Sequence, residues 1–309
     1  MYNYVITAPG QGVQQPGMLD AWLAAVPQAH KRITEWSDIV GFDMVPASRD
    51  EVMLGDTAIA QPLIVAAALL SFELLRDRMD SDDVLFAGHS VGELAAAAGA
   101  GYISATTAIT LAGVRGAAMS AACAVTESGM AAVMPTKRDG ATDAAIVAAI
   151  GAAGLIVANW NGSHQFVAAG TKDRIDAFIE ARPRGLRIVP LTVAGAFHTD
   201  AMATATPSFA KAAAEAAFLE SASAMVGNGD GALITSPDDL RQRLIAQITA
   251  PVRWDLCART IAAHAATDAP HLELAPAGPL TRLLERERPE ARALAIRTPE
   301  DIDPTAEAA

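Results

Sequence analysis

Short apolar runs alternate with longer apolar segments of helical length along the first part of the chain. The short runs are rich in β-branched and aromatic residues and predict buried strands, whereas the Ala- and Leu-rich segments predict helices. We expect strands at 4–8 and 84–87 and helices at 57–76, 93–100 and 105–125. Strands that alternate with helices indicate an α/β fold built around a parallel sheet.

The pattern changes near residue 128, where strands follow one another more closely. We expect strands at 130–134, 155–159, 165–169 and 186–193, and helices at 141–152 and 173–181. The order β-α-β-β-α-β is typical of a ferredoxin-like split unit. The sequence therefore predicts a ferredoxin-like small domain, residues 128–195, inserted into a larger domain formed by residues 1–127 and 196–309.

Composition supports a large core and argues against two classes of partner. The chain is 51% hydrophobic and only 19% charged, and its formal net charge is −12. A strongly negative chain is repelled by phosphate backbones and by anionic lipid, so we expect neither nucleic acid nor a membrane surface as partner. The start, Met1-Tyr2-Asn3-Tyr4, lacks the basic segment that opens a secretory signal, so we expect a cytoplasmic protein.

Two further features bear on environment. Residues 94–114 carry no charge and are long enough to span a bilayer, but a break at 101–104 favours two buried helices instead. Cys123 and Cys257 form neither a disulfide framework nor a metal-ligand set, so we expect buried thiols and no metal.

The candidate chemistry centres on the pentapeptide Gly88-His89-Ser90-Val91-Gly92. Such a G-x-S-x-G run is a weak signal alone, but here it stands between a predicted strand and a predicted helix, as a nucleophile elbow does. Glycines permit the sharp turn, which exposes the serine hydroxyl and aims the Val91 N–H at the same point. The context predicts an α/β-hydrolase-like larger domain and a serine acyl-enzyme. The spacing Ser90-x-x-Glu93 also fits a capping box, so we interpret Glu93 as a helix cap.

A serine nucleophile needs a base, and the chain offers six histidines. His198 follows a predicted strand at the junction of the two proposed domains, where ligand sites are common. His89 should point to another face of the turn. An α/β-hydrolase-type thioesterase or esterase would instead use a late histidine, and His264 or His271 would fit that alternative.

Two other features fit an acyl-enzyme site. The Gly10-Gln11-Gly12 loop offers a second backbone N–H for an oxyanion hole, although it also fits an ordinary strand-end turn. Arg115 is a lone cation in an apolar helix. It either reaches solvent or an ion-pair partner, or it binds a substrate carboxylate.

Together these segments resemble the malonyl-CoA:acyl carrier protein transacylases of the bacterial free-standing type. The resemblance runs over nearly the whole chain and lies in seven separated motifs in the family's order. These are Pro9-Gly10-Gln11-Gly12; Ala60-Gln61-Pro62; Ala87 to Glu93; Arg115-Gly116 with Met119; Asn159 to Gly162 with Gln165; Gly195-Ala196-Phe197-His198 with Met202; and Gln247 with Pro251-Val252-Arg253-Trp254.

The resemblance implies a role for each matching residue. It implies Ser90 as nucleophile, His198 as base, the N–H groups of Gln11 and Val91 as oxyanion hole, Arg115 as anchor of the malonyl carboxylate, and the main-chain carbonyl of Gln247 as the group that orients His198. It also implies an S-malonyltransferase with malonyl-CoA and acyl carrier protein as partners and no cofactor, serving fatty acid or polyketide synthesis. We expect it to act as a monomer.

Some positions depart from the family pattern. Val13 replaces a common serine, which should matter little because the neighbouring oxyanion donor is a backbone group. Trp160 stands where relatives often carry arginine, so no contact to coenzyme A or carrier protein is assigned there. The run before His198 resembles malonyl-selective members. A scaffold that binds carrier protein without catalysis is the remaining alternative.

Overall fold

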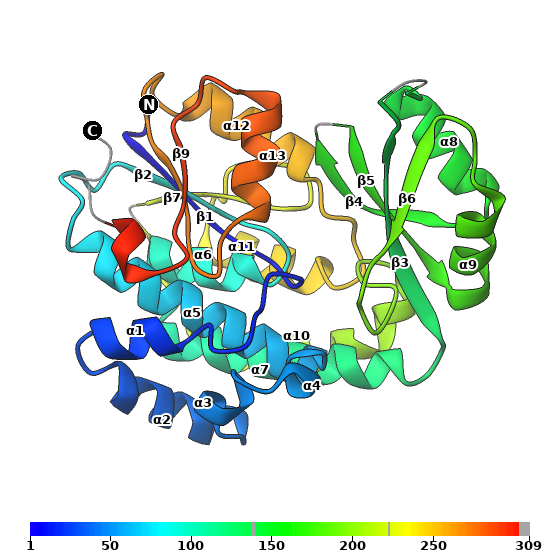
Figure 1. The fold of residues 1–309 in the computed structure, drawn as a ribbon. Helices are drawn as coiled ribbons and strands as arrows, with labels where there is room; N and C mark the ends of the chain where they lie inside the picture. The colour runs from blue at the N-terminus through cyan, green and yellow to red at the C-terminus, as the bar shows by residue number, and fades with distance from the viewer. Residues whose placement is uncertain (138–139, 163, 222, 303–309) are drawn as a thin grey trace.

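Two β-sheets of different kinds organise the molecule (Figure 1). The computed structural model describes residues 1–302 except 138–139, 163 and 222. The larger sheet is parallel and has the order β7-β2-β1-β8-β9. Its strands are β1 (Tyr4–Ala8), β2 (Val84–Gly88), β7 (Ala224–Val226), β8 (His271–Glu273) and β9 (Ala293–Ala295). The first two pair in register, with Tyr4 opposite Val84 and Ala8 opposite Gly88.

Helices cover both faces of the parallel sheet, which explains why its strands are apolar throughout. Val5 and Leu85 pack on one side with α12 (Trp254–His264) and α13 (Pro279–Glu287), whereas Ile6 and Phe86 belong to the large core on the other side. That core contains α5 (Thr57–Arg76), α6 (Gly92–Ala100) and α7 (Ala105–Cys123). The remaining elements are α1 (Asp20–Ala25), α2 (Ala29–Val40), α3 (Met44–Ala47), α4 (Glu51–Leu54), η1 (Asp200–Ala205), α10 (Thr206–Glu215), α11 (Pro237–Ala246) and η2 (Pro299–Ile302).

The second sheet is antiparallel and has the order β4-β5-β3-β6. Its elements are β3 (Ser128–Pro135), α8 (Asp143–Ala152), β4 (Ile156–Gly162), β5 (Gln165–Thr171), α9 (Lys172–Ala181) and β6 (Leu186–Pro190). Alternate residues of β3 point to opposite faces: Ala131 and Val133 pack on α8 and α9, whereas Met130 joins the large core.

The parallel sheet and the separate antiparallel sheet confirm the predicted fold class. Strand β6 ends at Pro190, before the predicted limit at 193. We keep the predicted domain limits, 1–127 with 196–309 and 128–195, as a proposal; residues 303–309 lie outside the described part of the chain.

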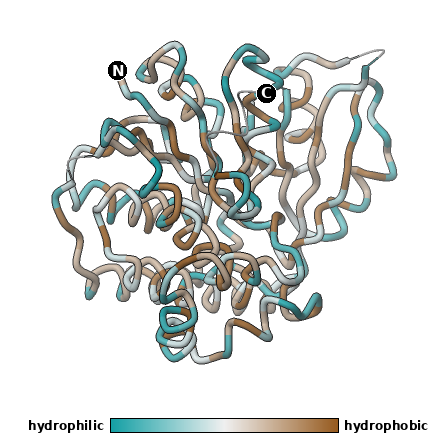
Figure 2. Tube along the Cα trace, turned by 60° about the vertical axis from the view of Figure 1, so that its left-hand side comes forward, coloured by the Kyte–Doolittle hydropathy of each residue, from teal (hydrophilic) through white to brown (hydrophobic). Residues whose placement is uncertain are grey.

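The uncharged stretch 94–114 is divided as expected. Helix α6 ends at Ala100, Gly101 takes φ +92°, and the Ser104 side chain accepts the Thr107 N–H where α7 begins. One described helix, α5, is long and apolar enough to cross a membrane, but 72% of its most apolar window is buried inside the protein. Figure 2 shows such apolar segments running through the middle of the chain trace. Helix α5 is therefore a core helix.

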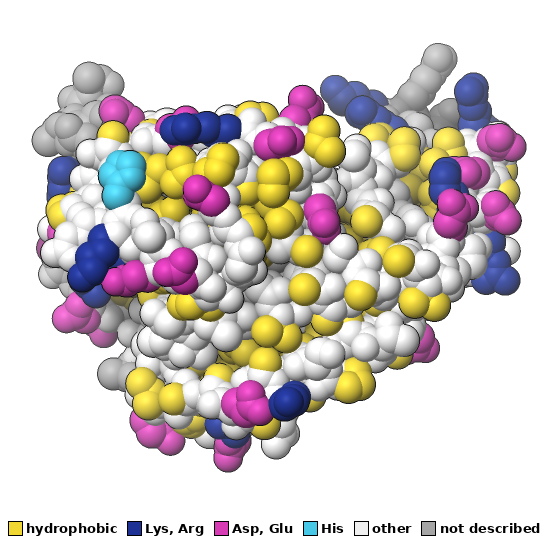
Figure 3. All heavy atoms as spheres, turned by 90° about the horizontal axis from the view of Figure 1, so that it is seen from below, with side chains coloured by type: hydrophobic (Ala, Val, Ile, Leu, Met, Phe, Trp, Pro, Cys, Tyr) yellow, Lys and Arg dark blue, Asp and Glu magenta, His cyan; other side chains and the backbone are white. Residues whose placement is uncertain are grey.

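The distribution of surface charge and the burial of the two cysteines can be compared with the expectations from the sequence. The face seen from below carries charges of both signs, so the net negative charge does not make it uniformly acidic (Figure 3). Cys257 is buried, but Cys123 at the end of α7 is only half-buried, so the expectation of two buried thiols is wrong for Cys123.

Candidate active site

Ser90 occupies a sharp turn between β2 and α6, with φ +55°. Only glycine fits on either side of it. A Cβ at Gly88 would lie 2.2 Å from the carbonyl carbon of Gly92, and a Cβ at Gly92 would lie 2.2 Å from the Ala8 oxygen. A non-glycine residue in the left-handed region is uncommon and marks functional turns. The local sequence thus forces the serine out of the sheet, as the elbow geometry requires.

His198 lies directly against this serine. The Ser90 Oγ is 2.8 Å from His198 Nε2, and His198 Nδ1 is 2.9 Å from the main-chain oxygen of Gln247. A carbonyl only accepts, so Nδ1 carries the proton and Nε2 is free to accept from the serine. Burial lowers the pKa of His198 to about 3, with the Arg115 charge acting in the same direction. The imidazole is therefore neutral at neutral pH, as a general base must be.

Two backbone N–H groups beside Ser90 are available to a ligand. In the described residues, neither the Val91 N–H nor the Gln11 N–H donates to a protein acceptor. The loop that carries Gln11 passes close to the elbow, since a Cβ at Gly10 would lie 3.4 Å from the Ser90 Cβ. Free N–H groups next to a nucleophile can stabilise an oxyanion.

Arg115 reaches the same point from α7 while being only 2% exposed. It donates to Gln61 Oε1 and to Gln247 Oε1, both at 2.8 Å, and to Ser90 Oγ at 3.3 Å. Burial lowers the pKa of Arg115 to about 10, and the Glu93 charge acts in the opposite direction, so the group stays cationic at neutral pH. The guanidinium neither reaches solvent nor joins an ion pair among the described residues.

The structure overturns the interpretation of Glu93 as a helix cap. The N-cap of α6 is Val91, without a side-chain hydrogen bond, and Glu93 is 1% exposed. Its two carboxylate oxygens accept from the Asn228 N–H, at 2.7 Å, and from the Gln247 side-chain amide. The prediction was wrong because a capping box and a buried glutamate in the first turn of a helix have the same Ser-x-x-Glu spacing in the sequence.

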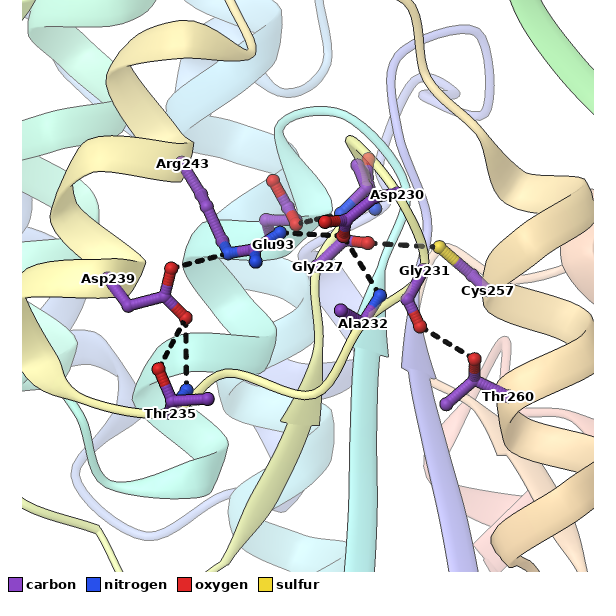
Figure 4. A network of polar contacts seen from close by, with 11 residues as sticks. Glu93, Gly227, Asp230, Gly231, Ala232, Thr235, Asp239, Arg243, Cys257 and Thr260 are labelled. Atoms are coloured by element: carbon purple, nitrogen blue, oxygen red, sulfur yellow. Dashed lines mark hydrogen bonds and ion pairs between the residues drawn. The ribbon is translucent and has the colours of Figure 1, made fainter.

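Sequence reasoning also missed Asn228, which follows β7. Its Oδ1 accepts the Ser90 N–H at 2.8 Å, and its Nδ2 donates to the Gly88 oxygen. Figure 4 shows the loop that carries it beside Glu93. Nothing local in the sequence marks this asparagine, because its partners lie more than a hundred residues away.

A cavity of about 460 Å³ opens beside the elbow, between the two sheets. Residues from three places line it: the Gly10–Gly12 loop with His89, the antiparallel sheet, and α13 with Arg282 and Arg286. The His89 Nε2 lies 3.1 Å from Asn161 Oδ1, so His89 faces this cavity and not the serine hydroxyl.

The other predicted positions lie elsewhere. His264 contacts the Thr260 carbonyl within α12, and His271 lines a separate cavity of about 30 Å³. Neither contacts Ser90 among the described residues. Trp160 stacks under the Arg253 guanidinium, 4.7 Å from the ring centre. No group of three or more His, Cys, Asp or Glu side chains that could hold a metal is found in the part of the chain that the structure describes.

Comparison with known proteins gives a consistent result. Residues 4–247 match the acyl transferase domain family. The chain is 41% identical over 304 residues to "Malonyl CoA-acyl carrier protein transacylase" of Mycobacterium tuberculosis, covering 96% of this chain and 97% of that protein. It is 30% identical over 295 residues to the protein of the same name from Escherichia coli, covering 93% of each.

Solved structures are similar as well. The crystal structure of MCAT from Mycobacterium tuberculosis superposes with a TM-score of 0.91 at 40% identity, covering 98% of this chain and 99% of that chain. The malonyl-CoA:ACP transacylase from Synechocystis gives a TM-score of 0.86 at 28% identity, covering 97% and 99%.

Proposed function

The chain belongs to the malonyl CoA-acyl carrier protein transacylases of the acyl transferase family, and we propose that it moves malonyl from malonyl-CoA to acyl carrier protein through an ester on Ser90. The observation that carries this proposal is the contact of one hydroxyl, Ser90 Oγ, with both a neutral imidazole and a buried guanidinium. The imidazole activates the nucleophile, and the guanidinium selects an acyl group that ends in a carboxylate.

In the first half-reaction, His198 Nε2 takes the Ser90 proton while Oγ attacks the thioester carbonyl carbon. The oxyanion that forms accepts from the N–H groups of Val91 and Gln11, and losing one such donor costs about 3 kcal/mol of transition-state stabilisation. The carbon–sulfur bond then breaks, and His198 returns the proton to the departing coenzyme A sulfur. The Gln247 carbonyl holds the imidazole throughout, in place of a triad carboxylate.

In the second half-reaction, the phosphopantetheine thiol of acyl carrier protein loses its proton to His198 and attacks the ester carbonyl carbon. The bond from that carbon to Ser90 Oγ then breaks, and His198 returns the proton to Oγ. Arg115 binds the free malonyl carboxylate through a charge-assisted pair and so holds the ester in place between the two steps. An acetyl group leaves that guanidinium without its anionic partner, which disfavours acetyl in the transition state.

Further attributes follow from the same proposal. We propose that catalysis needs no cofactor beyond the thioester, that the enzyme works in the cytoplasm as a monomer, and that it supplies malonyl for fatty acid or polyketide synthesis. A thioesterase with His264 or His271 as base is disfavoured, because neither histidine contacts Ser90.

The experiment that tests the function measures where the acyl group goes. The chain is incubated with malonyl-CoA and either holo acyl carrier protein or water alone as acceptor. We expect malonyl on the carrier protein and slow hydrolysis without it, both abolished in Ser90→Ala. Hydrolysis as fast as transfer would show a thioesterase, and no acyl movement at all would show a non-catalytic scaffold.

A further inference from the structure

Arg115 is a buried cation that contacts no acidic side chain within the part of the chain that the structure describes. Its side-chain partners are the amide oxygens of Gln61 and Gln247 and the Ser90 hydroxyl, all of them neutral. An isolated charge inside a protein is costly, and buried charges are generally paired. Before any substrate carboxylate arrives, another group must compensate this guanidinium.

Glu93 reaches the guanidinium through one amide. The Gln247 Nε2 donates to a Glu93 oxygen, while Gln247 Oε1 accepts from Arg115 Nη2 at 2.8 Å. Glu93 is as buried as Arg115, and its negative charge raises the pKa of Arg115 against the effect of burial. The three side chains therefore form one buried unit of acid, amide and base.

We propose that Glu93 is the buried counter-ion of Arg115 and a positioning residue that sets the preference for malonyl by orienting the Gln247 amide. A carboxylate only accepts hydrogen bonds, so the Gln247 amide must turn its NH₂ toward Glu93 and its oxygen toward Arg115. This arrangement holds the guanidinium where the malonyl carboxylate binds. The inference rests on the proposed function and concerns the acyl specificity of the same site.

The support of Ser90 depends on Glu93 only in part, since the Gln247 Nε2 that Glu93 accepts from also donates to the Ser90 carbonyl at 3.0 Å. Asn228, which accepts the Ser90 N–H, sits in a loop with anchors of its own (Figure 4). Arg243 binds Asp230 in that loop, and the Cys257 thiol donates to the Gly227 oxygen. Neutralising Glu93 should therefore disturb Arg115 more than the nucleophile.

The substitution Glu93→Gln keeps the side-chain volume at position 93 and forces the Gln247 amide to turn around. The Asn228 N–H is a fixed donor, so the new carboxamide must keep its oxygen there and turn its NH₂ toward Gln247. Gln247 must then rotate its amide, which takes its NH₂ away from the Ser90 carbonyl and places it against Arg115. Two donors face each other, and the guanidinium loses both its counter-ion and its acceptor.

Protonation of Glu93 removes the same charge in the wild type. Burial raises the pKa of Glu93 to about 7, against the Asn228 and Gln247 hydrogen bonds and the charges of Arg115 and Arg243. Burial also raises the pKa of the nearby Cys257 thiol well above its ordinary value, so that group stays neutral. The malonyl carboxylate, which acetyl-CoA lacks, has an ordinary pKa of about 4 and stays ionised above pH 5.5. The enzyme base and the other titrating groups are common to both substrates, so the ratio of their kcat/KM values isolates the effect of Glu93.

The test measures kcat/KM for malonyl-CoA and acetyl-CoA with the full chain, carrier protein as acceptor. In Glu93→Gln we expect the malonyl-to-acetyl ratio to fall about tenfold or more, chiefly through KM for malonyl-CoA. The rate of Ser90 labelling by phenylmethanesulfonyl fluoride should stay within about twofold of wild type. The matched control is Glu273→Gln, an equally buried carboxylate that accepts from Leu280 and Thr281 and contacts neither Arg115 nor Gln247 among the described residues; it should leave the ratio unchanged.

A second measurement does not depend on the variant folding. In the wild type, the malonyl-to-acetyl ratio should fall as the pH is lowered from about 8 to about 5.5, because Glu93 becomes neutral. A ratio that is constant over this range, or equal losses for both substrates in Glu93→Gln, would overturn the proposal. Failure of the proposed function itself is separate, because the wild type would then transfer no malonyl at any pH.

Discussion

Replacing Arg115 by alanine should change the enzyme's choice of acyl group more than its capacity for acyl transfer. The guanidinium lies 3.3 Å from Ser90 Oγ, and we propose that it binds the free carboxylate of a short dicarboxylic acyl group there. Hydrogen bonds to charged groups contribute about 1.5–3 kcal/mol each, so losing two of them costs about 3 kcal/mol. That loss lowers kcat/KM for malonyl-CoA roughly 150-fold. Acetyl-CoA makes no such contact and should lose little.

The assay compares malonyl and acetyl transfer to carrier protein in wild type and Arg115→Ala, with thermal unfolding measured alongside. Stability should fall too, because the Gln61 and Gln247 oxygens lose their donor. Arg115→Lys is the informative control: it keeps the charge but cannot reach both oxygens, so we expect an intermediate ratio. If Arg115→Ala keeps the malonyl preference, or loses both substrates equally, the assignment of Arg115 as carboxylate anchor is refuted.

Three further predictions concern the base and the elbow. His198→Ala should lower transfer about a thousandfold, whereas His264→Ala and His271→Ala should keep full activity in the same assay. The folded pKa of His198, about 3, lies below its ordinary value of 6.5, so the unfolded chain takes up the proton first and stability falls as the pH drops below 6.5. Chemical denaturation should show about 2 kcal/mol lost from this group between pH 7 and pH 5, and a His198→Ala variant should lack that component. Gly92→Ala should destabilise the fold by about 3 kcal/mol, while Gly129→Ala, with open space around it, should not; equal melting temperatures would contradict the close approach seen at the elbow.

Local patterns predicted most of the fold, because each helix or strand can be identified from a short run of neighbouring residues. The apolar run before Gly88 and the glycines around Ser90 identify a strand and a turn without reference to the rest of the chain. The split β-α-β-β-α-β unit could be predicted from the sequence for the same reason. Its strands alternate between two buried faces, and that alternation appears directly in the residue order.

The site was only partly predictable, because its geometry depends on contacts between distant segments. The Ser90 pentapeptide is local, and the family resemblance indicated His198. Glu93 and Asn228 had no such signal. From the sequence alone, a glutamate in the first turn of a helix cannot be distinguished from a helix cap. Asn228 contacts the elbow only because β7 pairs with β2 in the folded chain.

Intact mass spectrometry after mixing the chain with malonyl-CoA tests whether Ser90 carries the malonyl group between the two thiols. We expect a single malonyl adduct on the wild type, located at Ser90, that disappears when holo acyl carrier protein is added and never forms in Ser90→Ala. An adduct that persists in Ser90→Ala, or no adduct on the wild type while carrier protein is still acylated, would contradict this role of Ser90.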